Sequence, residues 1–248
     1  MKYFNDFQDT LYTFGNEALP TLTQDITRYV DVIDQIKDDI SFLTFYTIRE
    51  GYRPDQVSVQ LYDTPLFYWT FYLLNDDIRQ QGWPLNNFEF QTYIKKIFPN
   101  TVLTTRENIS TKFKVGQTAT GVDTGASGKI IRRNLDLGQI VVQGTVNFRQ
   151  GGESITSTNS SGVVETVTAV SSSAEHQAAN YYTDTSGLIV DLDVDNITGN
   201  LLAPGVTKNE ITNEQSYFNV NESLRQIKVI RPNLINTLVT GYKKAIRQ

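Results

Sequence analysis

The sequence predicts an α+β protein in which helical flanks enclose a β-rich middle. Two shifts in composition support this division, because residues 108–207 hold 12 of the 16 glycines but only 15 of the 49 charged residues. Glycine mixed with serine and threonine is typical of turns between short strands, whereas the charged flanks carry helical periodicity. We therefore expect three parts, residues 1–107, 108–207 and 208–248.

Overall composition narrows the classes of function. The 248-residue chain is 39% hydrophobic, enough for a core, and its net charge of −5 argues against electrostatic binding to nucleic acid. The longest mostly apolar run, Pro65–Leu74, is too short to span a bilayer. The chain has no cysteine, and its one histidine, His176, is expected at the surface or in a loop. We predict no enzyme activity, no metal, no cofactor and no membrane association.

The N-terminal part should contain one strand and several helices. Apolar residues at spacings of three and four predict an amphipathic helix over 25–40, and aromatic and β-branched residues predict a strand over 42–48. Proline at a first helical position, once after a capping threonine, predicts helices over 54–62 and 65–74. A further helix is expected over 87–98, with two lysines in its last turn.

The middle of the chain reads as short strands of a small barrel or sandwich. Residues 129–132 and 139–143 flank a glycine-containing turn and predict a hairpin. Residues 113–120 and 148–156 share a similar pattern of phenylalanine, glycine and threonine, which suggests two related strands. Serine and threonine make up 11 of the 20 residues 154–173, so we expect part of that stretch to be a loop.

The C-terminal tail predicts a strand followed by an amphipathic helix. Residues 226–230 are strand-like, and Pro232 suits the start of the helix. Apolar residues form one broad stripe along this helix, composed of Leu234, Ile235, Leu238, Val239, Tyr242 and Ile246. A helix this short needs packing partners for that stripe, either on this chain or on another protein.

One acidic segment superficially resembles a calcium loop. Residues 191–195 alternate aspartate with apolar residues, but an EF-hand requires Gly and Glu where this chain has Asn196 and Leu202. Strand alternation explains the same letters, with Leu192 and Val194 facing inward. Adjacent carboxylates elsewhere point in different directions, so no acid–base pair is predicted.

Pro65–Leu74 would be apolar on every side of a helix. A small surrounding domain has too little other structure to cover all of these side chains. We therefore expect some of Tyr68, Trp69 and Tyr72 to contact another subunit, where aromatic residues with a polar tip are favoured.

Several short motifs occur in an order that resembles a known family. These motifs are Arg53–Val57, Leu61–Pro65, Tyr68-Trp69, Leu74–Asp76 and Gly82–Pro84. Together they resemble the central block of the gene 53 baseplate wedge proteins of T-even-like, contractile-tailed bacteriophages. Asn221–Pro232 resembles that family's C-terminal motif, so the resemblance covers roughly residues 20–105 and 210–248 and leaves the middle of the chain uncovered.

The resemblance implies a structural role without catalysis. It implies a LysM-like βααβ block, and a subunit that packs against other wedge proteins and bridges neighbouring wedges, with sheath-initiator-like and hub proteins as further partners. The expected location is the virion tail baseplate, assembled in the host cytoplasm. A LysM module that binds peptidoglycan or another glycan is the alternative. The protein-interface candidates are Arg53, Tyr62, Tyr68, Trp69, Tyr72, Trp83, Leu224, Arg225, Ile227, Leu234 and Leu238.

Overall fold

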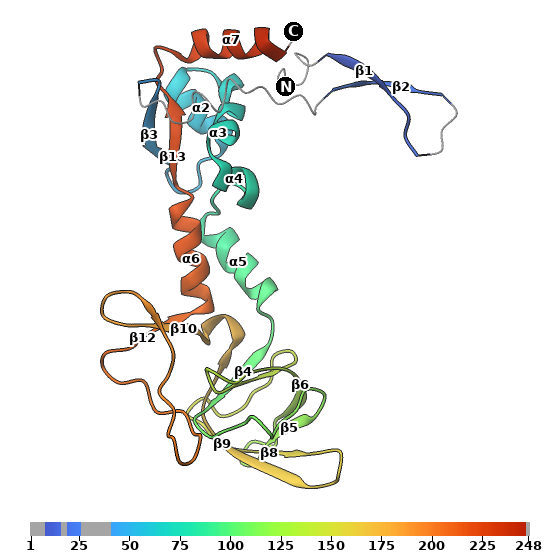
Figure 1. The fold of residues 1–248 in the computed structure, drawn as a ribbon, viewed down its shortest axis with the longest axis vertical. Helices are drawn as coiled ribbons and strands as arrows, with labels where there is room; N and C mark the ends of the chain where they lie inside the picture. Colours follow the sequence, from blue (N-terminus) through green and yellow to red (C-terminus); the bar gives the residue numbers. More distant parts are fainter. Residues whose placement is uncertain (1–7, 16–18, 26–40, 247–248) are drawn as a thin grey trace. The chain divides into compact units, whose positions relative to one another are not determined.

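The protein has an α+β fold that divides into two compact units. Its structure, a computed structural model, describes residues 8–15, 19–25 and 41–246 (Figure 1). Unit 1 combines Met1–Asn87 with Asn221–Gln248, and unit 2 comprises Phe88–Val220. The helix predicted over 25–40 falls almost wholly outside the described residues. The three-part division by composition stays a prediction about which segments fold independently.

Unit 1 joins the two flanks of the sequence through a two-stranded antiparallel sheet. Strand β3 pairs with β13 in a register that runs from Leu43↔Ile230 to Thr47↔Gln226. The predicted strands over 42–48 and 226–230 are both confirmed. The elements of unit 1 are β1 (Asp9–Tyr12), β2 (Thr21–Gln24), β3 (Leu43–Thr47), α2 (Pro54–Tyr62), the 3-10 helix η2 (Pro65–Phe67), α3 (Trp69–Leu74), α4 (Asp76–Gln81), β13 (Gln226–Ile230) and α7 (Ile235–Ile246).

The helices of unit 1 follow the capping signals of the sequence, with one break. Helix α2 begins at Pro54 as predicted, and the Arg53 backbone N–H donates to Gln56 Oε1 in a capping box at 2.9 Å. The single helix predicted over 65–74 is wrong, because η2 and α3 divide it at Tyr68. The Ser58 hydroxyl of α2 accepts from the Phe67 N–H at 3.2 Å, and this hydrogen bond holds η2 against α2.

The C-terminal helix packs on unit 1 itself. The predicted stripe is confirmed in part: Ile235, Val239 and Tyr242 are buried, while Leu234 and Leu238 are half-buried against the same cluster. The Tyr242 ring stacks on Trp69, with ring centroids 5.4 Å apart. Helix α7 therefore covers one side of the hydrophobic core that it shares with α3 and the β3–β13 sheet (Figure 1).

Unit 2 is built around a closed antiparallel barrel in the order β4-β7-β6-β5-β8-β9. A small sheet in the order β11-β10-β12 lies outside the barrel, and the predicted helix over 87–98 is confirmed as α5. The elements are α5 (Asn87–Ile97), β4 (Thr101–Thr105), β5 (Thr118–Gly121), β6 (Ser127–Asn134), β7 (Gln139–Val142), β8 (Ser154–Thr158), β9 (Val164–Ala174), the 3-10 helix η3 (Glu175–Gln177), β10 (Ala179–Thr183), β11 (Ile189–Val190), β12 (Asn209–Thr212) and α6 (Asn213–Ser223).

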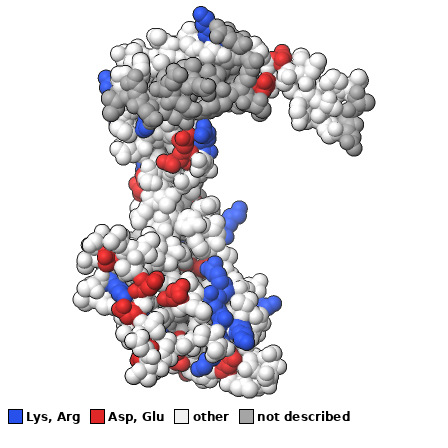
Figure 2. Space-filling model, viewed as in Figure 1, with Lys and Arg blue, Asp and Glu red and all other residues white. Residues whose placement is uncertain are grey.

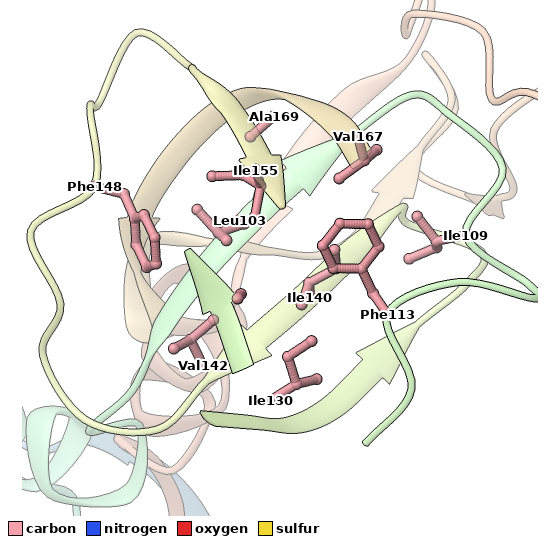
Figure 3. Close-up of a cluster of buried hydrophobic side chains, with 11 residues drawn as sticks. Leu103, Ile109, Phe113, Ile130, Ile140, Val142, Phe148, Ile155, Val167 and Ala169 are labelled. Atoms are coloured by element: carbon pink, nitrogen blue, oxygen red, sulfur yellow. The ribbon is translucent and has the colours of Figure 1, made fainter. Parts of the chain in front are cut away.

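The barrel is filled by apolar side chains that alternate along its strands. Leu103, Ile140 and Ile155 point into the interior from three different strands (Figure 3). Phe113 and Phe148, the first residues of the two similar segments, lie in this same core, and the strands that follow them, β5 and β8, pair side by side. Of the two architectures predicted, a small barrel or a sandwich, the structure has the barrel, and the predicted β6–β7 hairpin is confirmed.

Part of the serine- and threonine-rich stretch 154–173 is a loop, as expected: residues 159–163 connect β8 and β9. The rest of the stretch forms these two strands, because β-branched threonines suit a strand. The inward orientation expected for Val194 is wrong: Leu192 is buried but Val194 is 51% exposed, since only an isolated bridge continues the strand there. His176 lies in η3, the short connection between β9 and β10, and its side chain is half-buried.

Buried carboxylates in unit 2 are satisfied by backbone amides. Glu153 accepts from the N–H groups of Arg149, Asp123 and Thr124 at 2.8 to 3.1 Å and from the Thr124 hydroxyl. Burial acts to raise the pKa of Glu153, but these hydrogen bonds outweigh it and the pKa is lowered. A carboxylate with a lowered pKa stabilises the fold above its ordinary pKa of 4.5, and this stabilisation is lost as the pH falls through the folded-state pKa.

We predict that Glu153→Gln destabilises unit 2 at neutral pH by about 1–3 kcal/mol, because buried amides lose an acceptor. Urea unfolding of both proteins across the pH range measures the difference, which should shrink at acidic pH, where Glu153 of the wild type is protonated. Exposed Gln150→Ala is the matched control and should behave like wild type. A difference that is constant with pH would contradict the ionised role of Glu153.

Candidate protein-contact site

The N-terminal hairpin formed by β1 and β2 is exposed at seven of its eight strand residues. Strands β1 and β2 pair antiparallel from Asp9↔Gln24 to Tyr12↔Thr21. The Leu11↔Leu22 pair occupies one face, and these side chains are 66% and 64% exposed. Because residues opposite each other share a face, the hairpin presents an apolar pair there without a covering layer among the described residues.

The other face of the hairpin is aromatic. Tyr12 and Phe14 lie two residues apart, so they share that face, and their rings meet edge to face with centroids 4.9 Å apart. Leu19 is also exposed beyond the other strand. Both faces of a two-stranded sheet therefore carry exposed large hydrophobic side chains.

Sequence reasoning missed this hairpin. The alternation of residues 9–14 and 21–24, with Gly15 between them, is the signal that could have found it. The strands have only four residues each, and threonine dilutes the apolar alternation.

Long-range hydrogen bonds connect α2, α3 and β13 within unit 1. The Asn75 side chain donates to Lys228 O at 2.9 Å and accepts from Lys228 N at 2.8 Å, which fastens β13 to the end of α3. The Tyr62 hydroxyl donates to Ile230 O at 2.9 Å, and burial raises the pKa of this phenol. The Trp83 indole N–H donates to Tyr52 O at 2.7 Å. These hydrogen bonds fix the relative positions of α2, α3 and β13, and so of the side chains that they carry at the surface.

The eleven predicted interface residues divide by exposure. Trp69, Leu224 and Ile227 are buried core residues of unit 1, and Arg53 is exposed with its guanidinium paired to Asp55 at 2.6 Å. The others are half-buried at the surface of the same unit: Tyr62, Tyr68, Tyr72, Trp83, Arg225, Leu234 and Leu238. All eleven are brought together in one unit, and their contact with a partner stays a prediction.

The described residues hold no cluster of three or more metal-ligating side chains. Asp193 instead pairs with Lys208 at 2.8 Å, and Asp195 accepts from the N–H groups of Ile197 and Thr198. Within the described ranges, every helix falls short of the length and apolar character needed to cross a membrane.

Comparison with known protein families finds a match for the N-terminal part of the chain. Residues 3–101 match the family of base plate wedge protein 53. The match confirms the resemblance to the gene 53 baseplate wedge family, a family of structural phage baseplate proteins of the virion tail. It covers the hairpin, β3 and α2 to α5, and ends as β4 begins. The resemblance of Asn221–Pro232 lies outside it and stays a prediction. No match was found among curated proteins.

We predict that Ile235→Ala lowers the stability of the isolated protein by about 2–5 kcal/mol, because it leaves a cavity under α7. Asn236→Ala, at the next and exposed position of the same helix, is the matched control and should change little. Thermal unfolding followed by tryptophan fluorescence reports the change, since Trp69 contacts this helix through Tyr242. Equal midpoints for the two variants would show that α7 does not pack on its own subunit.

Proposed function

We propose that this protein is a baseplate wedge subunit that joins neighbouring wedges through protein–protein contacts, with the β1–β2 hairpin as its principal contact element. The family match supplies the baseplate role, and the exposed apolar faces of the hairpin are the observation that carries the bridging role. Assembly would take place in the host cytoplasm before the tail is complete.

The physical basis is the low stability of a lone hairpin. An isolated two-stranded hairpin is marginally stable in water, and it usually needs a third strand or a packed face. Large exposed apolar groups such as Leu11 and Leu22 stabilise a hairpin only when another surface covers them. A partner in the next wedge would provide that surface, and repetition around a closed ring would reinforce contacts that are individually weak.

Electrostatics favour a particular kind of partner surface. Residues 8–25 contain acidic residues, among them Asp9 and Asp25, and no lysine or arginine. A partner surface that is apolar at its centre and basic at its rim would complement this segment.

A LysM-type glycan-binding module remains the second candidate, on one observation. Along the chain β3, α2, α3 and β13 occur in a strand–helix–helix–strand order with other elements between them, and the two strands pair antiparallel. The closing strand, however, arrives only after α4 and the whole of unit 2, so the block is LysM-like at most in its pairing. Pelleting of the purified protein with cell walls would favour the LysM function, whereas recovery in purified virions would favour the wedge function.

We predict that the double variant Leu11→Thr, Leu22→Thr weakens incorporation into wedge complexes at least tenfold while the isolated protein stays folded. Threonine keeps the strand propensity but removes the apolar face. Co-expression with the other wedge proteins of the same phage, followed by affinity pull-down, measures incorporation. Gln24→Thr, on the same face of β2, is the matched control. Wild-type incorporation of the double variant would refute the hairpin contact.

A further inference from the structure

A large, open cavity lies in unit 2, and polar and apolar groups share its wall about equally. Only the wall residues between 95 and 101 belong to the part of the chain that matches the wedge family. The volume of the cavity is about 750 Å³, and it opens where the end of α5, the segment 145–150 and the end of β9 meet. This volume lies within the range of about 300–1,000 Å³ typical of sites for small ligands. The residues of its wall used below are Lys95, Phe98, Asn147, Gln150, Ser173 and His176.

The inner wall of the cavity is fixed by its own hydrogen bonds. Asn100 Oδ1 accepts from Gly144 N at 3.0 Å, and its Nδ2 donates to the buried Glu175 carboxylate at 2.7 Å. The Thr101 hydroxyl donates to Gly144 O at 2.9 Å and accepts from Val146 N. These hydrogen bonds hold the wall in place, so rotation of its side chains would not close the cavity.

Several other polar side chains of the wall have unused hydrogen-bonding capacity, whereas His176 Nε2 lies 4.0 Å from a Glu214 carboxylate oxygen. Within the described part of the chain, the side chains of Lys95, Asn147, Gln150 and Ser173 have no hydrogen-bond partner. Amides and a hydroxyl both donate and accept, so together they suit a ligand that does the same at many points of its surface. A polyhydroxylated ring fits that requirement.

One aromatic and one charged side chain of the wall restrict the kind of ligand further. Phe98 lines the cavity and packs edge to face on Tyr217, with centroids 5.4 Å apart, so its ring has a fixed orientation against which an apolar ring face could lie. The wall contains the Lys95 ammonium and no aspartate or glutamate. Acidic and basic residues both lie on the face of unit 2 drawn in Figure 2, so selectivity for an anion would come from Lys95 rather than from a general field.

We propose that this cavity binds a saccharide residue and that Lys95 favours one that carries a carboxylate. The unpaired amides and hydroxyl would bond the sugar hydroxyls, and Lys95 would pair with a carboxylate at the edge of the ring. One exposed ion pair should make a sugar acid bind about two- to fivefold more tightly than the matching neutral sugar. This site is independent of the proposed wedge contacts.

The chain contains its own reporter for this test. His176 is the only histidine and lines the cavity, so the ring C–H signals of the full-length protein report on it by NMR without further assignment. The two tryptophans, Trp69 and Trp83, lie in unit 1 and provide an internal control. The probes are glucose, N-acetylglucosamine and glucuronate at constant pH, with acetate as a carboxylate that lacks the ring.

We expect the sugars to shift the His176 signals saturably, glucuronate at two- to fivefold lower concentration than glucose, while the tryptophan signals stay fixed. The double variant Asn147→Ala, Gln150→Ala should abolish the response. Gln143→Ala, an exposed glutamine outside the cavity, should retain it. Lys95→Gln should make glucose and glucuronate equal.

Three results would overturn the saccharide site, and a fourth would overturn the role of Lys95. The first is the absence of a saturable shift with all three sugars, and the second is an equal response to acetate and glucuronate, which would indicate an anion site. The third is a response that persists in the double variant. A preference for glucuronate that survives Lys95→Gln would overturn the assignment of the carboxylate to Lys95. Each result leaves the wedge role untouched, because the hairpin variant tests that role separately.

Discussion

The pairing of β3 with β13 is the constraint on which the structure of unit 1 depends. It joins segments about 180 residues apart in sequence, and closing so long a loop carries an entropic cost that must be met by local contacts. The Asn75–Lys228 and Tyr62–Ile230 hydrogen bonds supply some of those contacts, and Ile227 and Val229 supply apolar burial. Without the C-terminal strand, the helices α2 and α3 would lose the sheet that covers them.

Sequence reasoning succeeded where the signal was local. The start of α2 follows from Pro54 at its first position, and the strand 226–230 follows from five consecutive residues with strand character. It failed where tertiary contacts decide the outcome. The break at Tyr68 coincides with the hydrogen bond from Phe67 N to Ser58, a residue of another helix. The composition of 154–173 predicted a loop there, but it did not predict the two paired strands on either side of residues 159–163.

The candidate site shows the same limit. A list of aromatic residues predicts which side chains are large, but it cannot separate Trp69, buried against Tyr242, from Trp83, half-buried with its indole N–H bonded to Tyr52. The two tryptophans look alike in the sequence, because the burial of a side chain depends on the residues that pack against it, and these come from distant positions in the chain. The hairpin was missed for a different reason, since its strands have only four residues each and threonine dilutes their apolar alternation.

The place at which unit 2 is inserted explains how unit 1 tolerates it. The chain leaves unit 1 after Asn87 and returns at Asn221. Asn221 Oδ1 accepts from Leu85 N at 2.8 Å, and its Nδ2 donates to Leu85 O at 3.0 Å. These bonds hold the exit and the return next to each other, so the inserted chain does not have to span any distance across unit 1. Loop-closure entropy rises only slowly with length, so the size of the insert has little effect on the β3–β13 pairing. Unit 2 can therefore carry a function of its own while unit 1 keeps its fold.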